Sequence, residues 1–336
     1  MQRACEDSPT APGGPPPHPA GATGKSLGGC RTRALGPRPT HGPQVTCDTV
    51  GVGGSVPQTP ARASVTGMDL PSLVDSLAST PGPVLTWYGR DRTELGGAVA
   101  SRWLAKTANL LAGDLSGDLF DGWGETGTAT AAGAGPDTAG ADPAPTGTIR
   151  VDLGRSWQSV AWLSASWLSG WRSVGAAAGS LGEEGGADVA VVAEVTPAEL
   201  GAVAEGRWVL AQATGPLALS WPGTLPEGVL DALAELSAQP DALEVVPAVS
   251  PEVVVTDTVA GTDGPLRLGD LGRRAAVWAG APSRVLLRPE TPEADALAVL
   301  SLWASGRSVV MVDAQTHGAV DLARIARTEK AHPQEP

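Results

Sequence analysis

The stretch SRVLLRPETPEADALAVLSLWASGRSVVMVD, residues 283–313, decides the fold class. Residues 284–287 form a short apolar run rich in branched side chains, which is typical of a buried strand. Thr291 followed by Pro292 and an acidic residue predicts a helix start, with a hydroxyl cap and proline in the first turn. Residues 308–312 form a second apolar run. A strand, a helix and a strand within about thirty residues predict a parallel crossover unit of an open α/β sheet.

The helix of this unit has an apolar face. Its large apolar side chains recur at three- and four-residue steps, which places them on one side of a helix. They are Ala296, Val299, Leu300 and Trp303. Gly306 marks the end of the helix. We therefore expect this face to pack against the sheet.

The same alternation of strands and helices continues through the rest of the chain. Strands are predicted over residues 83–88, 148–153, 187–193, 207–213 and 251–256. Helices are predicted over residues 70–77, 94–110, 157–168, 197–203, 226–238 and 268–278. Nearly continuous apolar strands separated by helices predict an α/β fold with mostly parallel sheets and flanking helices.

Tryptophan is the dominant aromatic residue, with eleven copies against one tyrosine and one phenylalanine. Trp157, Trp162, Trp167 and Trp171 lie close together, three of them within a predicted helix. They could form a box that stacks on a ligand, but large aromatic side chains at helical spacing more commonly fill a core. We therefore expect these four residues to be buried.

Residues 1–67 differ in composition from the rest of the chain. They are rich in proline and glycine, contain no aromatic residue, and include all three cysteines, Cys5, Cys30 and Cys47. A segment with so few large apolar groups cannot compensate for the entropy lost on folding, so we predict a disordered arm. Periodic helical sequence begins at Met68, and the arm is either a disordered extension or an over-extended start. Three unevenly spaced cysteines indicate free thiols in a reducing compartment, which predicts a cytoplasmic protein.

One α/β domain is predicted over residues 68–336. Its two halves are expected at about 68–212 and 213–336. A low-complexity run over residues 124–147 predicts a flexible surface insertion.

The charge and the motif content exclude several classes of function. A net charge of -13 argues against a nucleic-acid surface, which needs clustered basic residues. No apolar run is long enough for a membrane span. The four histidines are scattered, so neither a metal site nor a catalytic triad is predicted. Asp313 follows a predicted strand, where a role in capping the loop is the more common one for aspartate.

The order of elements resembles the N-terminal part of AMP-binding enzymes, which are the acyl-CoA synthetases, adenylation domains and luciferases. The similar features are a Thr86-Trp87-Tyr88 strand, Glu94-Leu95 followed by an alanine-rich helix, and an Ala187-Asp188 strand start. More narrowly, the chain resembles a small actinobacterial family of unassigned function. LTWYGRDRTELGGAVASRWLAKTANLL, residues 85–111, and SRVLLRPETPEADALAVL, residues 283–300, carry this second resemblance.

The resemblance implies a degenerate phosphate loop. In AMP-binding enzymes a strand runs into a loop rich in threonine, serine and glycine that ends in Gly-x-Pro-Lys and holds the ATP phosphates. Residues 253–267 occupy that place here. The resemblance therefore implies that ATP or AMP is the candidate ligand. The implied binding residues are Thr258, Gly261, Thr262, Gly264 and Arg267.

The chain departs from the family pattern within this loop. Asp263 places a negative charge where a hydroxyl is usual, and this charge opposes the binding of phosphate. The lysine position holds Leu266 or Arg267, depending on a one-residue gap. The chain also ends before the later motifs of these enzymes, so no catalytic residue is predicted.

Three functions remain open. The first is a truncated, non-catalytic relative of AMP-binding enzymes that keeps a weak crevice for a nucleotide or an acyl ligand. The second is a structural or interaction module, in which a second copy or a partner protein covers an open sheet edge. The third is an acyl-activating, ATP-dependent ligase that is completed by another chain.

Overall fold

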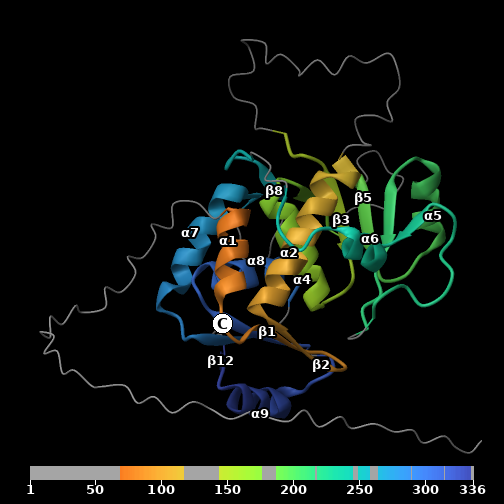
Figure 1. Cartoon of the computed structure of the whole chain (residues 1–336). Helices are drawn as coiled ribbons and strands as arrows, with labels where there is room; N and C mark the ends of the chain where they lie inside the picture. Colours follow the sequence, from red (N-terminus) through yellow and green to blue (C-terminus); the bar gives the residue numbers. More distant parts are fainter. Residues whose placement is uncertain are drawn as a thin grey trace, which may run out of the picture. The chain divides into compact units, whose positions relative to one another are not determined.

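The computed structural model describes residues 69–116, 144–175, 187–215, 218–244, 249–257, 264–288, 290–313 and 315–333. These residues all belong to one compact unit, Arg62–Pro336. The predicted arm at residues 1–67 and most of the predicted insertion at residues 124–147 lie outside the described ranges. The described strands form two sheets, with helices packed between and around them (Figure 1). This arrangement confirms the α/β fold with mostly parallel sheets and flanking helices.

The crossover unit predicted from residues 283–313 is present. It consists of β10 (Arg284–Leu287), α8 (Pro292–Ala304) and β11 (Ser308–Val312). The two strands are adjacent and parallel, as the pattern predicts.

The ends of α8 follow the predicted signals. The Thr291 hydroxyl oxygen accepts a hydrogen bond from the backbone N–H of Ala294 at 3.1 Å. Gly306, which adopts a φ of +71°, follows the end of the helix. The predicted apolar face is buried, and Leu297 and Leu302 are buried as well. The helix is buried on more than one side because it packs against other helices as well as against its sheet.

The first sheet brings together strands from both ends of the described chain. Its order is β12-β10-β11-β1-β2, with β1 at Pro83–Tyr88, β2 at Arg92–Gly96 and β12 at His332–Pro333. β1 lies beside β11 in parallel orientation, and β2 pairs with β1 in antiparallel orientation.

The helix predicted over residues 94–110 begins later than expected. Residues 92–96 form β2 instead, because Leu95 is buried in the pairing with β1. The helix α2 is Gly97–Ala112. A Cβ atom at Gly97 would lie 2.2 Å from the carbonyl oxygen of Leu77, so the helix can start at this point only with glycine. The prediction started the helix at residue 94 and missed this hairpin.

The second sheet has the order β7-β6-β5-β3-β4-β8-β9. Its strands are β3 (Thr148–Asp152), β4 (Arg172–Ser173), β5 (Val189–Val192), β6 (Trp208–Ala211), β7 (Val229–Asp231), β8 (Val254–Thr256) and β9 (Leu266–Arg267). All neighbouring strands are parallel except β8 and β9, which form an antiparallel pair at one edge.

The helix predicted over residues 226–238 is only partly present. Residues 229–231 form β7, which pairs with β6, and the helix α6 starts at Ala232 and ends at Ala238. Asp231 sets this start, because its carboxylate accepts a hydrogen bond from the backbone N–H of Leu233 at 3.0 Å. Its side chain is an N-cap, which the sequence prediction placed inside the helix.

The remaining described helices lie close to their predicted positions. They are α1 (Leu70–Ser79), α4 (Trp157–Leu168), α5 (Pro197–Ala204), α7 (Leu268–Val277) with a short 3₁₀ turn at Trp278–Gly280, and α9 (Ala319–Glu329).

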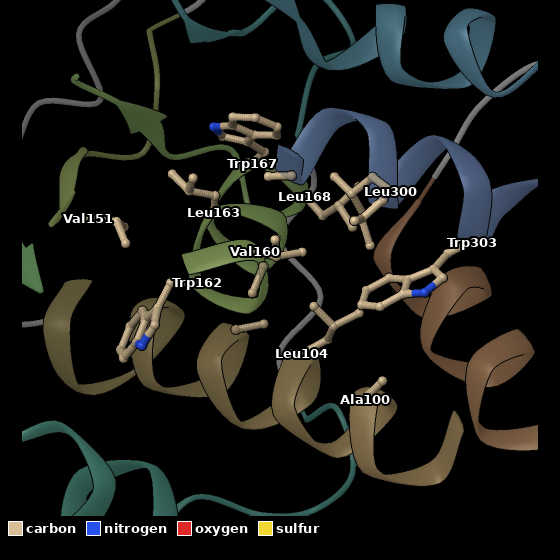
Figure 2. Close-up of a cluster of buried hydrophobic side chains, with 14 of the residues drawn as sticks. Ala100, Leu104, Val151, Val160, Trp162, Leu163, Trp167, Leu168, Leu300 and Trp303 are labelled. Carbon is tan, nitrogen blue, oxygen red and sulfur yellow. The ribbon is translucent and has the colours of Figure 1, made fainter. Parts of the chain in front are cut away.

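The core is built around α4, which packs between α2 and α8 (Figure 2). Every residue of α4 is buried, and the four tryptophans at positions 157, 162, 167 and 171 are at most 7% exposed. The prediction that they fill a core is confirmed. Figure 2 also shows Trp303 of α8 beside Leu104 of α2, and the indole N–H of Trp303 donates to the carbonyl oxygen of Val84 at 3.1 Å.

Candidate functional site

The strand pair β8–β9 is the place that the resemblance assigns to the phosphate loop. Thr256 lies opposite Leu266, and Val254 lies opposite Arg267. The segment that joins the two strands contains the predicted site residues. Residues 258–263 lie outside the described ranges, so the structure says nothing about Thr258, Gly261 or Thr262.

The structure describes the other two predicted residues, Gly264 and Arg267. Gly264 has a φ of +141°, a backbone conformation that residues other than glycine rarely adopt. The guanidinium group of Arg267 donates a hydrogen bond to the carbonyl oxygen of Glu252 at 2.8 Å. The side chain of Leu266 is only 2% exposed and belongs to the core. Of the two residues at the lysine position, Arg267 is therefore the one that can meet a ligand.

A hollow of 640 Å³ lies beside this strand pair, and we call it the hairpin hollow. Its lining residues are Gly264, Pro265, Leu266, Arg267, Asp270, Arg273, Arg274 and Val277. Gly264 and Arg267 thus line the same hollow. The remaining charged residues come from α7, the helix that follows β9 directly.

The charges of the hairpin hollow favour an anion. Three guanidinium groups line it, against one carboxylate. That carboxylate, Asp270, accepts a hydrogen bond from the backbone N–H of Arg267 at 3.0 Å and forms an ion pair with Arg273. Arg274 forms no ion pair with any residue in the described ranges. Guanidinium groups are well suited to phosphate and carboxylate ligands because their donors form a planar fork.

The sequence prediction missed Arg273 and Arg274. The available signal was an adjacent pair of arginines in the helix that follows the loop, LGDLGRRAAV. The resemblance concerns the loop alone. The contribution of α7, the next helix, depends on how it packs against the strand pair.

A second hollow, of 270 Å³, lies at the carboxyl ends of β1, β3 and β11. Its polar lining includes Arg90, Asp91, Arg155 and Asp313. The carboxylate of Asp313 accepts hydrogen bonds from the backbone N–H of Gln315 at 3.0 Å and from a neighbouring threonine hydroxyl. The predicted loop-capping role of Asp313 is confirmed, and this role occupies both of its carboxylate oxygens.

Neither a metal cluster nor a membrane-spanning helix is found in the part of the chain that the structure describes. Within those ranges no group of three or more histidine, cysteine or acidic residues is arranged to hold a metal ion. No described helix combines the length and the apolar character that crossing a membrane requires.

Comparison with solved structures finds this fold in two kinds of enzyme. An acyl-CoA synthetase from Brucella canis matches with a TM-score of 0.52 and 18% sequence identity, over 79% of this chain and 46% of its own. The nonribosomal peptide synthetase FmoA3 matches with a TM-score of 0.50 and 15% identity, over 80% of this chain and 25% of its own. The AMPPNP-bound form of FmoA3 also matches, with a TM-score of 0.50 and 16% identity.

These similarities confirm the fold that the resemblance predicts. The chain spans less than half the length of each of these proteins. No protein-family model matches the chain, and no curated protein matches it in sequence.

Proposed function

We propose that the protein is a non-catalytic relative of the N-terminal part of AMP-binding enzymes, and that it binds a nucleotide phosphate in the hairpin hollow. The observation that carries the proposal is the group of three arginines, Arg267, Arg273 and Arg274, around this hollow. Its volume of 640 Å³ falls within the range of about 300–1,000 Å³ that is usual for small-molecule sites.

The similar structures support a nucleotide as the ligand. One of the matched structures, that of FmoA3, was solved with AMPPNP bound. The β8–β9 pair of the present chain lies where the resemblance places the loop that holds the nucleotide phosphates. We therefore expect a nucleotide to bind in the hairpin hollow. Gly264 and the sequence positions Thr258, Gly261 and Thr262 would contribute to its binding.

The non-catalytic part of the proposal rests on the loop chemistry. The loop ends in GTDGPLR, with Asp263 at a position where a hydroxyl is usual and no lysine. Leu266 is buried, and Arg267 is engaged with Glu252. Phosphate recognition would therefore depend mainly on Arg273 and Arg274 of α7, with a smaller contribution from Arg267, and we expect weak binding without activation of an acyl group.

Calorimetric titration of the full chain with ATP and magnesium tests the binding. We expect binding at roughly micromolar to sub-millimolar strength, weakened about tenfold or more in the double variant Arg273→Gln/Arg274→Gln because charged hydrogen bonds to phosphate are lost. Asp263→Thr should strengthen binding, because it removes a negative charge from the loop.

Arg324→Gln is the matched control. Arg324 pairs with an aspartate three residues earlier on α9, as Arg273 does on α7, but it does not line the hairpin hollow. The control should leave ATP binding unchanged. Absence of heat at near-millimolar protein would contradict the nucleotide proposal. If the purified chain exchanged pyrophosphate into ATP when a carboxylic acid substrate is added, this result would contradict the proposal that the protein is non-catalytic.

A further inference from the structure

A further cavity, of 260 Å³, lies between α7 and α8. These two helices contact one another in the fold (Figure 1). Its lining residues are Arg274, Val277, Trp278, Leu287, Arg288, Glu290, Ala294, Asp295, Leu297, Ala298 and Ser301. We call it the α7–α8 cavity. Six of its eleven lining residues are apolar, and the buried charged residue in the wall is Asp295.

Asp295 is only 4% exposed, and one of its carboxylate oxygens has no partner. Oδ1 accepts a hydrogen bond from the backbone N–H of Glu290 at 3.2 Å. Oδ2 is buried and has no hydrogen-bond partner among the described residues. Buried polar groups in folded proteins are almost always satisfied, so an unpaired carboxylate oxygen in the wall of a cavity indicates a missing partner.

Burial is the main cause of the unusual titration of this group. Removal from water raises the pKa of Asp295 to about 7, and the hydrogen bond from the Glu290 backbone opposes that increase. Arg155, which precedes α4, lowers the pKa, and the carboxylates of Glu290 and Glu293 raise it.

The other charged groups of the cavity lie nearer to solvent. Arg288 and Glu290 are exposed and of opposite charge, and Arg274 is half-buried. None of them donates a hydrogen bond to Oδ2 of Asp295. Charges at an exposed rim are screened by water and salt, whereas a charge inside the cavity is screened much less.

We propose that the α7–α8 cavity binds a small organic cation, a primary amine with an apolar body, through an ion pair between its ammonium group and Asp295. The apolar body would lie against Trp278, Leu287 and Leu297. An ammonium group supplies the hydrogen-bond donor that Oδ2 lacks. It also supplies a compensating charge, which has its largest effect where water is excluded. This inference does not rest on the nucleotide proposal.

The test is a titration of the full chain with 2-phenylethylamine, by calorimetry at pH 6, 7 and 8. The amine is a cation throughout this range, so the pH dependence reports on the protein. Only the charged form of Asp295 pairs with the ligand, and we therefore expect apparent affinity at pH 6 to be about tenfold weaker than at pH 8. At pH 7 binding should release about half a proton per ligand, measurable by comparing buffers of different ionisation enthalpy.

Variants and a matched ligand separate this proposal from simple apolar binding. Asp295→Asn should abolish amine binding, and Asp321→Asn, on α9, should leave it unchanged. 3-Phenylpropionate has a similar apolar body with a negative charge, and it should not bind. Three outcomes would each overturn the proposal. They are tighter binding of the propionate than of the amine, unchanged amine binding in Asp295→Asn, and the absence of amine binding at millimolar ligand. If Asp295→Asn does not fold, proton release by the unmodified chain decides the question, and binding without release would overturn it.

Discussion

Glu329 of α9 and Tyr88 of β1 are joined by a hydrogen bond of 2.5 Å from the phenol hydroxyl to the carboxylate. The same carboxylate accepts from Arg92 at 3.0 Å and from Arg284 at 2.8 Å, and its side chain is 9% exposed. Burial alone would raise the pKa of Glu329, but the hydrogen bonds from Tyr88, Arg92 and Arg284 outweigh that effect and lower it. The bonds attach the last described helix to the first sheet.

Replacement of Glu329 by glutamine should destabilise the protein by roughly 1–3 kcal/mol at pH 7, because Arg284 loses its ionised partner in a poorly hydrated position. The lowered pKa means that this contribution is present above the unfolded pKa and is lost as the pH falls through the folded pKa. The difference between Glu329→Gln and the unmodified chain should therefore shrink in acid. Urea unfolding at several pH values measures it. Glu94→Gln removes an exposed partner of the same Arg92 and should change stability by less than about 0.5 kcal/mol.

A buried ion pair connects β3 to α5. Arg150 donates to Glu199 at 2.6 Å, and both side chains are less than 10% exposed. Burial opposes ionisation of Glu199, yet hydrogen bonds from Thr196 and Arg150 lower its pKa. Glu199→Gln should cost roughly 3 kcal/mol, since it leaves the buried guanidinium with only the exposed carboxylate of Asp152, at 3.7 Å, as a charged partner. The exposed Glu205, paired with Arg207 at 2.9 Å, provides the control, and equal losses in the two variants would contradict this account.

Asp295 should make stability depend on pH in the opposite direction. Its folded pKa of about 7 lies above the ordinary value of 3.8, so the folded state holds a proton that the unfolded state releases. Stability should therefore fall as the pH rises from about 4 through about 7. Asp295→Asn removes the cost of ionising this buried carboxyl group. We expect the free energy of unfolding of the variant to exceed that of the unmodified chain by roughly 1–3 kcal/mol at pH 8, but not at pH 4. Urea unfolding at both pH values gives the comparison, for which Glu293→Gln is the control. A constant difference between the two pH values would show that Asp295 titrates normally.

The two adjacent glycines at the start of α2, Gly96 and Gly97, should differ sharply in their tolerance of alanine. At Gly97 a Cβ atom would lie 2.2 Å from the carbonyl oxygen of Leu77 and 2.6 Å from that of Thr80. Backbone atoms cannot move aside easily, so Gly97→Ala should cost roughly 2–3 kcal/mol. At Gly96 the nearest atom would be 3.8 Å away, and Gly96→Ala should cost less than about 1 kcal/mol. Thermal unfolding of the two variants is the measurement, and similar midpoints would contradict the packing of α2 against α1.

The elements that the sequence predicted well have their signals close together along the chain. The unit β10–α8–β11 is one example, because Thr291, Pro292 and Gly306 set the ends of the helix locally. β2 and β7 were missed because each depends on a partner strand, and their short sequences also fit the start of a helix.

The residues of the candidate sites also divide into those with a local sequence signal and those that depend on packing between distant segments. The resemblance led to Gly264 and Arg267, but Arg274 was missed because its position depends on how α7 packs. Asp295 was missed for a related reason. An acidic residue in the first turn of a helix ordinarily faces solvent, and the packing of α8 against its neighbouring helices buries this one.

The order of strands in the first sheet has a consequence for synthesis on the ribosome. β1 is made early, but its parallel neighbour β11 is near the end of the described chain. Until β11 emerges, the strand PVLTWY has only the short β2 to pair with in this sheet, and we expect its apolar side chains to be incompletely buried. Such long-range pairing slows folding and favours aggregation of incomplete chains. Translation that stalls before residue 308 should therefore leave a product that depends on chaperones.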